Sequence, residues 1–204
     1  MPVSDKEQIE IVKSWWKEYG YYILFSIVVF MSANFGWRYW QQYSHSRLES
    51  ASVIYTQMLT AIERQKKEEL KLFGEKLIKN YSSSPYASLA AFILAKDAVV
   101  SGNLKIAEDK LRFAIKNSSS KTLRQLARIR AARVLIALGK SHEALDLLTP
   151  VDDKGYDAEV SEVFGDALLA LGKVDEAEKA YRKAQHLSVD RAQSPLLKMK
   201  LQQF

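Results

Sequence analysis

The sequence predicts an all-α protein in which a single N-terminal transmembrane helix precedes a domain of helical repeats. Helix-forming residues crowd the chain after residue 40, and the 204 residues include only eight glycines and four prolines. An uncharged apolar stretch lies near the N-terminus, and one pattern of glycine and alanine recurs three times further on. With 48% hydrophobic and 26% charged residues, the composition excludes wholesale disorder.

The membrane segment runs from Tyr19 to Trp37, nineteen residues without a charge between Glu18 and Arg38. A helix of that length rises about 28 Å, close to the ~30 Å thickness of the hydrocarbon core of a bilayer. Aromatic residues, which favour the headgroup region, gather at its two ends: Trp15, Trp16, Tyr19, Tyr21 and Tyr22, then Trp37, Tyr39, Trp40 and Tyr43. We therefore predict an N-terminal arm over residues 1–18 and a transmembrane helix over residues 19–40, in contact with the lipid bilayer.

Two alternatives for this stretch are a buried core helix and a cleaved signal peptide. A core helix seldom runs so far without a charged face, and a signal peptide needs small residues after its apolar stretch. Residues 34–37, Asn-Phe-Gly-Trp, make a poor cleavage site. These observations favour a retained anchor.

The basic residues beside the span predict its orientation. Lys6, Lys13 and Lys17 precede it, and Arg38 and Arg47 follow it within a comparable distance. Because basic residues next to a span tend to stay cytoplasmic, this three-to-two difference favours a cytoplasmic N-terminus.

Two small residues within the span suggest a contact with another membrane helix. Ser32 and Gly36 are four residues apart and share one helix face, where another helix can approach closely. The alternative is that this single pair occurs by chance.

The repeat pattern places an alanine five residues after a glycine, in the pairs Gly102 and Ala107, Gly139 and Ala144, and Gly172 and Ala177. The position seven before each glycine is also small, and the position twelve after it is apolar: Ala95, Ala132 and Gly165, then Ala114, Val151 and Ala184. Small residues are needed where the axes of two paired helices lie 8–10 Å apart. Each unit is therefore expected to hold two helices, such as residues 158–171 and 175–187, with the glycine turning the chain between them.

This spacing resembles the tetratricopeptide repeat, whose period is about 34 residues. The third unit matches best, with its large, small and turn residues at Phe164, Gly165, Leu168, Gly172, Ala177, Tyr181 and Ala184. The units lack that repeat's aromatic near the start and its closing proline, and Pro150 is expected to cut the second helix of the middle unit short. A non-repetitive helical bundle is the alternative fold.

The segments beside the repeats complete the predicted organisation. Residues 41–84 are expected to form juxtamembrane helices and a degenerate first helix pair, residues 85–193 the three repeats, and residues 194–204 a C-terminal capping helix. Ser84 and Ser194 are each followed by proline, which is typical of a helix start.

Little in the sequence supports catalysis or a cofactor. There are no cysteines, and the three histidines stand in no metal-ligand or nucleophile-activating pattern. Residues 110–142 hold nine basic residues and no acid, and residues 152–166 hold six acids and one lysine. Because the basic residues do not share one face with stacking aromatics, we expect solvated faces, with some opposite charges meeting between neighbouring units, rather than nucleic-acid binding. The next hypothesis is that the basic residues bind an acidic protein partner.

The resemblance to tetratricopeptide arrays implies a partner-binding groove lined by the first helix of each unit. The groove positions are Leu89, Phe92, Lys96 and Val99, then Leu126, Ile129, Arg133 and Ile136, then Glu159, Glu162, Asp166 and Leu169. Exposed apolar grooves bind peptides or helices, although the terminal helix with Leu196, Leu197 and Leu201 is an alternative occupant. Reversing the charge of Arg133 and replacing Phe92 by Asp are expected to abolish partner capture without unfolding the domain.

Over its full length the chain resembles the ancillary SecYEG translocon subunits, the YfgM-like family. The resemblance lies in the order of "VKSWWKEYG", the apolar span, "GWRYW", "SASVIYTQML" and the degenerate repeats that end in "LLKMKLQQF". It implies a single-pass protein of the bacterial inner membrane with a cytoplasmic N-terminus and a periplasmic repeat domain. The implied partners are the SecYEG translocon, the membrane-anchored chaperone PpiD and unfolded secretory proteins. A second hypothesis is a cytoplasm-facing adaptor that binds an acidic partner, anionic lipid or nucleic acid through the basic segment.

Overall fold

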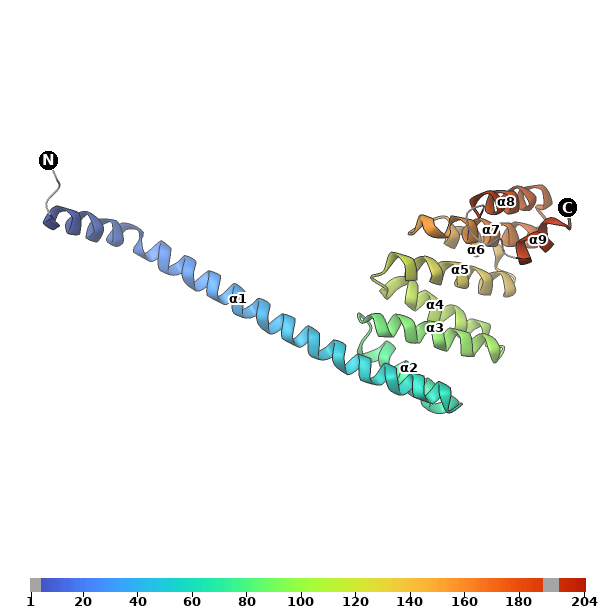
Figure 1. Cartoon of the computed structure of the whole chain (residues 1–204), viewed down its shortest axis with the longest axis horizontal. Coiled ribbons are helices and arrows are strands. Elements are labelled where there is room, and N and C mark those ends of the chain that lie inside the picture. The colour runs from blue at the N-terminus through green and yellow to red at the C-terminus, as the bar shows by residue number, and fades with distance from the viewer. Residues whose placement is uncertain (1–4, 189–194) are drawn as a thin grey trace. The chain divides into compact units, whose positions relative to one another are not determined.

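The structure is a computed structural model that describes residues 5–188 and 195–204, and its regular elements are helices (Figure 1). It divides into two compact units, residues 1–49 and 50–204. The elements are α1 (Asp5–Glu63), α2 (Lys67–Asn80), α3 (Pro85–Val100), α4 (Leu104–Asn117), α5 (Lys121–Ala137), α6 (Ser141–Leu148), the 3-10 helix η1 (Lys154–Tyr156), α7 (Asp157–Ala170), α8 (Val174–Leu187) and α9 (Pro195–Leu201). The predicted all-α class is confirmed.

The described part of the first unit is the N-terminal part of α1, and the large apolar side chains that the structure describes there are exposed. No proline interrupts α1, so the span predicted over residues 19–40 belongs to a longer helix that begins at Asp5. It is the one helix of the described residues that is long and apolar enough to cross a membrane. Phe25, Val28 and Phe30 are more than half exposed, which suits a helix surrounded by lipid rather than water.

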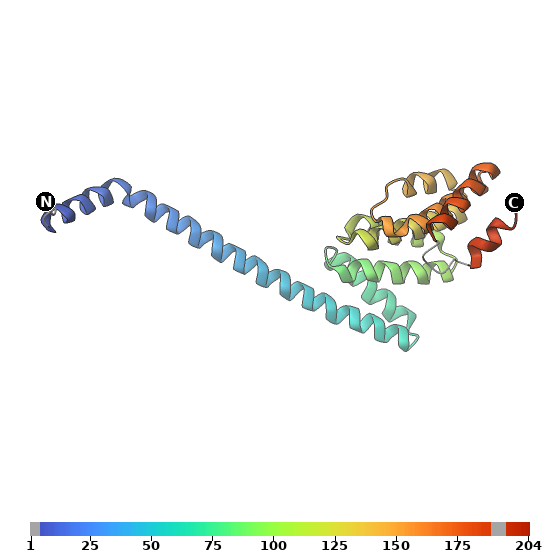
Figure 2. The same ribbon diagram turned by 45° about the horizontal axis from the view of Figure 1, so that its top comes forward.

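Aromatic side chains pack along both ends of the span. The ring centroids of Trp15 and Tyr19 are 6.0 Å apart, and those of Trp37 and Trp40 are 5.7 Å apart. The ring of Trp16 lies over Gly20, where an added Cβ would be 3.2 Å from the ring. The helix α1 changes direction near its N-terminal end (Figure 2).

The second unit begins with the C-terminal part of α1, which packs with α2 and α3. Ile54 and Met58 of α1, Leu77 of α2 and Leu94 of α3 share one hydrophobic cluster. Gly74 allows α2 to come close to α3, because a Cβ there would lie 2.8 Å from Cδ1 of Leu94. The C-terminal part of α1 and α2 pack together and precede α3, where the predicted repeats begin.

The three turn glycines adopt the same left-handed conformation. The φ angles of Gly102, Gly139 and Gly172 are 75°, 74° and 76°, a region that favours glycine. In each turn the amide after the glycine donates to a carbonyl five residues earlier, as Asn103 does to Ala98 at 2.8 Å and Lys173 to Leu168 at 3.0 Å. This Schellman motif ends the first helix of each pair and turns the chain into the second.

Small residues lie where the paired helices meet. Ala107, Ala144 and Ala177 are fully buried, and a Cβ at Gly165 would be 2.6 Å from Cε1 of Tyr181. Val151, twelve residues after Gly139, is exposed, whereas its counterparts in the neighbouring units, Ala114 and Ala184, are buried. The reason is that α6 ends at Leu148, two residues before Pro150, as the proline predicted.

Helix ends also follow the sequence signals. The Ser84 hydroxyl accepts a hydrogen bond from the amide of Ala87 at 3.2 Å, and Pro85 occupies the first turn of α3. The corresponding prediction for Ser194 lies outside the described residues. At the other end of the stack, Leu197 of α9 is buried against Leu168 and Tyr181.

Candidate partner-binding groove

An open groove of about 500 Å³ lies between α3, the start of α4 and α5. Four of the predicted groove residues line it: Phe92, Lys96, Val99 and Arg133. Sequence reasoning missed its other lining residues, which are Ala95, Val100, Leu104, Leu111, Arg130, Val134 and Ala137. The spacing of Arg130, Arg133 and Ala137, three and four residues apart, is the signal that places them on one helix face.

The groove has an apolar floor and a cationic rim. The guanidinium of Arg130 lies 5.0 Å from the centre of the Phe92 ring, a cation–π distance. Lys96, Arg130 and Arg133 are exposed, and none forms an ion pair with any residue in the described part of the chain. Three positive charges around an apolar surface favour a ligand that combines apolar and acidic side chains.

Several predicted groove positions lie elsewhere. Ile129 is only 2% exposed and belongs to the cluster that joins α5 to Val160 and Val163 of α7, so it is not available on the groove surface. Leu126 and Ile136 are half-buried against neighbouring clusters, and Leu89 is also half-buried. The open groove between α3, α4 and α5, here called the α3–α5 groove, therefore includes fewer of the predicted positions than expected.

The acidic third unit is covered by the C-terminal helix. Nζ of Lys200 in α9 lies 2.7 Å from Oε1 of Glu162 and 2.7 Å from Oδ1 of Asp166. Glu162 is buried, Glu159 is half-buried, and Leu169 at the end of α7 is exposed. The terminal helix thus occupies this part of the predicted groove and leaves the α3–α5 groove open.

Asp166 also accepts a hydrogen bond from the Tyr181 hydroxyl at 2.8 Å. Burial, this hydrogen bond and the nearby carboxylates of Asp166 and Glu162 raise the pKa of Tyr181. The phenol therefore stays protonated, as its donor role requires. Its contact with the ring of Phe204, 5.9 Å between centroids, adds to the attachment of the C-terminus.

Most of the basic segment forms ion pairs between neighbouring helices, which confirms the predicted pairing. Arg124 and Arg128 contact the two carboxylate oxygens of Asp152 at 3.2 and 2.9 Å. Arg112 pairs with Glu108 at 2.8 Å and with Glu143 of α6 at 3.2 Å. Further pairs join Lys110 to Glu75 and Lys140 to Glu108.

These cations lower the pKa values of two carboxyl groups, those of Glu108 and Asp152. Burial alone would raise the pKa of Glu108, but the hydrogen bond from Arg112 and the charges of Arg112, Lys105 and Lys140 outweigh it and hold the pKa below its ordinary value. The pKa of Asp152 is likewise lowered: burial opposes ionisation, and Arg128 and Arg124 more than compensate. Both carboxylates stabilise the junctions between units.

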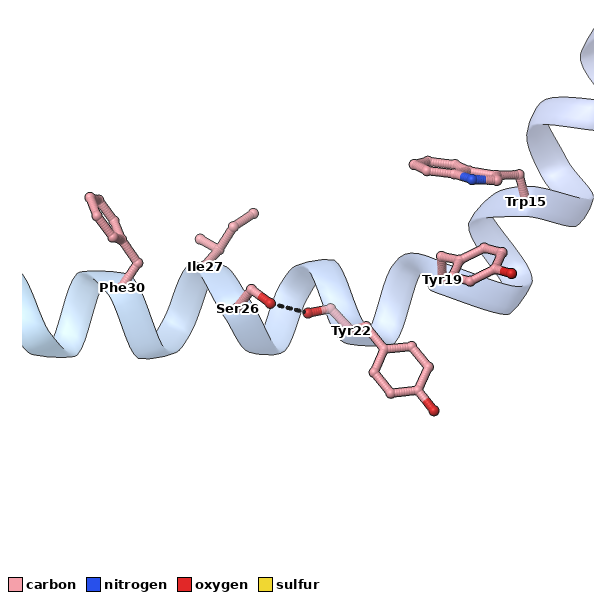
Figure 3. A pocket seen from close by; sticks show the side chains of 6 residues that line it. All are labelled: Trp15, Tyr19, Tyr22, Ser26, Ile27 and Phe30. Carbon is pink, nitrogen blue, oxygen red and sulfur yellow. Dashed lines mark hydrogen bonds between the residues drawn. The ribbon is translucent and has the colours of Figure 1, made fainter.

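Exposed side chains of α1 form a second candidate surface. Figure 3 shows Trp15, Tyr19, Tyr22, Ser26, Ile27 and Phe30 along a hollow on α1. The hydroxyl of Ser26 donates to the carbonyl of Tyr22 at 2.7 Å, which satisfies it within the helix. Ser32 and Gly36 are exposed, and a Cβ at Gly36 would meet nothing within 4 Å. This surface suits lipid or another membrane helix.

An exposed apolar helix, stacked helix pairs and an open groove define a membrane-anchored helical-repeat protein. A family profile described as a tetratricopeptide repeat-like domain matches residues 13–204. A protein named ancillary SecYEG translocon subunit from Aggregatibacter actinomycetemcomitans is 31% identical over 183 residues, which cover 90% of this chain and 89% of the relative.

Two further relatives carry the same name. The one from Haemophilus influenzae is 28% identical over 199 residues, covering 98% of this chain and 97% of the relative. The one from Escherichia coli is 27% identical over 198 residues, covering 97% and 95%. The chain therefore belongs to the family of ancillary SecYEG translocon subunits, with a tetratricopeptide repeat-like domain.

Proposed function

We propose that this chain is a membrane-anchored, non-enzymatic interaction module that associates with the SecYEG translocon and assists the biogenesis of secreted or membrane proteins. The observation that carries the proposal is the open α3–α5 groove, which combines an apolar floor with three cations that form no ion pair among the residues that the structure describes. Groove surfaces of this kind bind extended or helical segments of partner proteins. The names of the relatives support the translocon as the place where this binding occurs.

In this proposal the N-terminus is cytoplasmic and the repeat domain is periplasmic, in the bacterial inner membrane. The lysines that precede the span support this orientation. A reporter fused after Phe204 tests it: activity of a periplasm-specific reporter is expected. Activity of a cytoplasm-specific reporter alone would exclude the periplasmic role.

We further propose that the groove contacts the membrane-anchored chaperone PpiD or unfolded secretory chains, while Ser32 and Gly36 face a membrane helix of the translocon. Anchoring supports such contacts because it raises the local concentration of the groove beside the channel, so that weak binding suffices. The groove recognises partner segments that combine acidic and apolar side chains.

The second hypothesis, a cytoplasm-facing adaptor that uses its basic segment, has less support. Arg112, Arg124, Arg128 and Lys140 are engaged in ion pairs within the domain. Arg130 and Arg133 of the same segment line an apolar groove, which suits a protein segment better than a phosphate backbone.

The test of the groove is co-purification of PpiD and SecYEG with the full chain from membranes in mild detergent. The variant combines Lys96→Glu with Arg133→Glu. Its matched control combines Lys116→Glu with Lys121→Glu, which makes the same charge change at exposed positions outside the groove. The groove variant is expected to lose PpiD and keep SecYEG, and the control to keep both. Equal recovery of PpiD with both variants would contradict the groove assignment.

A further inference from the structure

A second open hollow, of about 560 Å³, lies between the end of α6, α7 and α8. It exists because α6 has 8 residues, whereas α4 and α8 each have 14. The missing residues correspond to about 9 Å of helix. The chain that replaces them is held on α5, since Asp152 pairs with Arg124 and Arg128 and Asp153 accepts from the Thr122 hydroxyl at 2.7 Å.

The junction between the first two repeats indicates what belongs in this hollow. There, α4 continues past Leu111, and its Ala114 is buried against Ala127 and Ala131 of α5. The spacings of 37 and 33 residues make Leu148, Val151, Val160 and Phe164 the counterparts of these four residues. All four counterparts line the hollow. Val151 is exposed and Phe164 is half-buried, whereas their counterparts Ala114 and Ala131 are buried, so the cover that α4 gives the first junction is incomplete in the next.

The hollow also has an uncompensated charge. Lys179 and Lys183 of α8 lie at its edge, and both are exposed. Within residues 5–188 and 195–204, neither forms an ion pair, while the nearby Glu176 pairs with Lys173 at 3.2 Å. A helix with an acidic edge would complement both lysines.

We propose that this hollow is a docking surface for one short amphipathic helix of a partner protein, with an acidic edge, which takes the place of the turns that α6 lacks. Its apolar side chains contact Val151, Phe164 and Ala180, and its carboxylates face Lys179 and Lys183. The surface lies on different helices from the α3–α5 groove. The proposal therefore stands independently of the function proposed above.

The test measures binding of a defined probe to the purified full chain in detergent micelles. The probe is a fluorescent, end-capped helical peptide of about three turns, with leucines along one face and glutamates beside them. A matched peptide carries lysine at every glutamate position. Fluorescence anisotropy is recorded against the chain and, to correct for micelle binding, against empty micelles.

Two variants alter the hollow: Lys179→Glu with Lys183→Glu removes the complementary charge, and Ala180→Trp fills the space. Ala180 is half-buried, and thermal melts establish that both variants are folded. Each is expected to weaken binding of the acidic peptide about tenfold or more, and the lysine peptide is expected to bind about tenfold more weakly to the unchanged chain. Because the α3–α5 groove also suits acidic, apolar segments, every measurement is made in the Lys96→Glu, Arg133→Glu background, where binding of the acidic peptide to the hollow is expected to persist.

Three results would overturn the proposal. The first is no binding of the acidic peptide, and the second is binding that the hollow variants leave unchanged. The third is self-association of the chain that Ala180→Trp abolishes, since a second copy would then be the occupant.

Discussion

The Nζ atom of Lys200 lies 2.7 Å from Oε1 of Glu162, so the last helix is tied to the first helix of the third repeat. The lysine side chain is 17% exposed and the glutamate side chain 9% exposed. Removing one partner of such a pair leaves a carboxylate poorly solvated. The C-terminal helix therefore closes the stack by an ion pair as well as by the packing of Leu197.

Replacing Lys200 by Gln is expected to destabilise the domain by about 2 kcal/mol, less than a fully buried pair would lose. Hydrogen exchange is expected to rise first in α9 and then in the facing part of α7. Lys198→Gln is the control, because Lys198 is exposed on the same helix. Equal exchange in the two variants would show that the ion pair does not hold α9.

Gly165→Ala is expected to destabilise the domain by roughly 1–2 kcal/mol. Alanine would add about 0.5–1 kcal/mol of helix stability, but its Cβ would lie 2.6 Å from the Tyr181 ring, and overpacking of this kind costs about 1–3 kcal/mol. Chemical denaturation of the full chain in detergent measures the difference. In the background of Tyr181→Leu, which removes the ring, the same change should cost less; an unchanged cost would exclude the clash as the cause.

Stability is expected to fall as the pH drops below about 4. The pKa values of Glu108 and Asp152 are lowered in the folded state, so the unfolded chain takes up protons first as the pH falls. The contribution of these groups is complete above their ordinary pKa values, about 4–4.5, and is lost as the pH drops through their folded values. Glu108→Gln with Asp152→Asn should flatten this part of a plot of the unfolding midpoint against pH, whereas Glu68→Gln with Asp109→Asn, at exposed positions, should not.

The groove is expected to tolerate an acidic substitution at Val99 but not at Phe92. Phe92 is 8% exposed, so Phe92→Asp would bury a carboxylate and is expected to cost about 3 kcal/mol or more. We therefore correct the expectation from the sequence that Phe92→Asp leaves the domain folded: this substitution is expected to destabilise it. Val99 is 44% exposed, and Val99→Asp should block an apolar ligand with a melting temperature close to that of the unchanged chain. A large fall in melting temperature for Val99→Asp would contradict this placement.

Local signals predicted the repeats well. Gly102, Gly139 and Gly172 were identified by spacing alone, and all three have the positive φ that a helix–turn–helix needs. Pro150 correctly predicted a short α6, because a proline cannot continue the helix. These features depend on the chemistry of single residues and their near neighbours.

Positions set by packing between units were harder to predict. Ile129 was assigned to the groove from a repeat template, but the rotation of α5 about its axis depends on its contacts with α7. Arg130 was missed because its role depends on Phe92, 38 positions earlier in the chain. The hollow beside α6 likewise arises from what the short helix fails to cover, which a periodic pattern does not describe.

The most direct test of the central claim, that the repeats bind partners of the translocon through the α3–α5 groove, is photocrosslinking in living cells. A photoreactive amino acid is placed at Val99 of the full chain, and a control chain carries it at Leu72, which is 64% exposed on α2 and outside the groove. We predict adducts from Val99, identified by mass spectrometry, with PpiD or an unfolded secretory chain, and none of these from Leu72. Absence of both partners from the Val99 adducts, or the same adducts from both positions, would contradict the account.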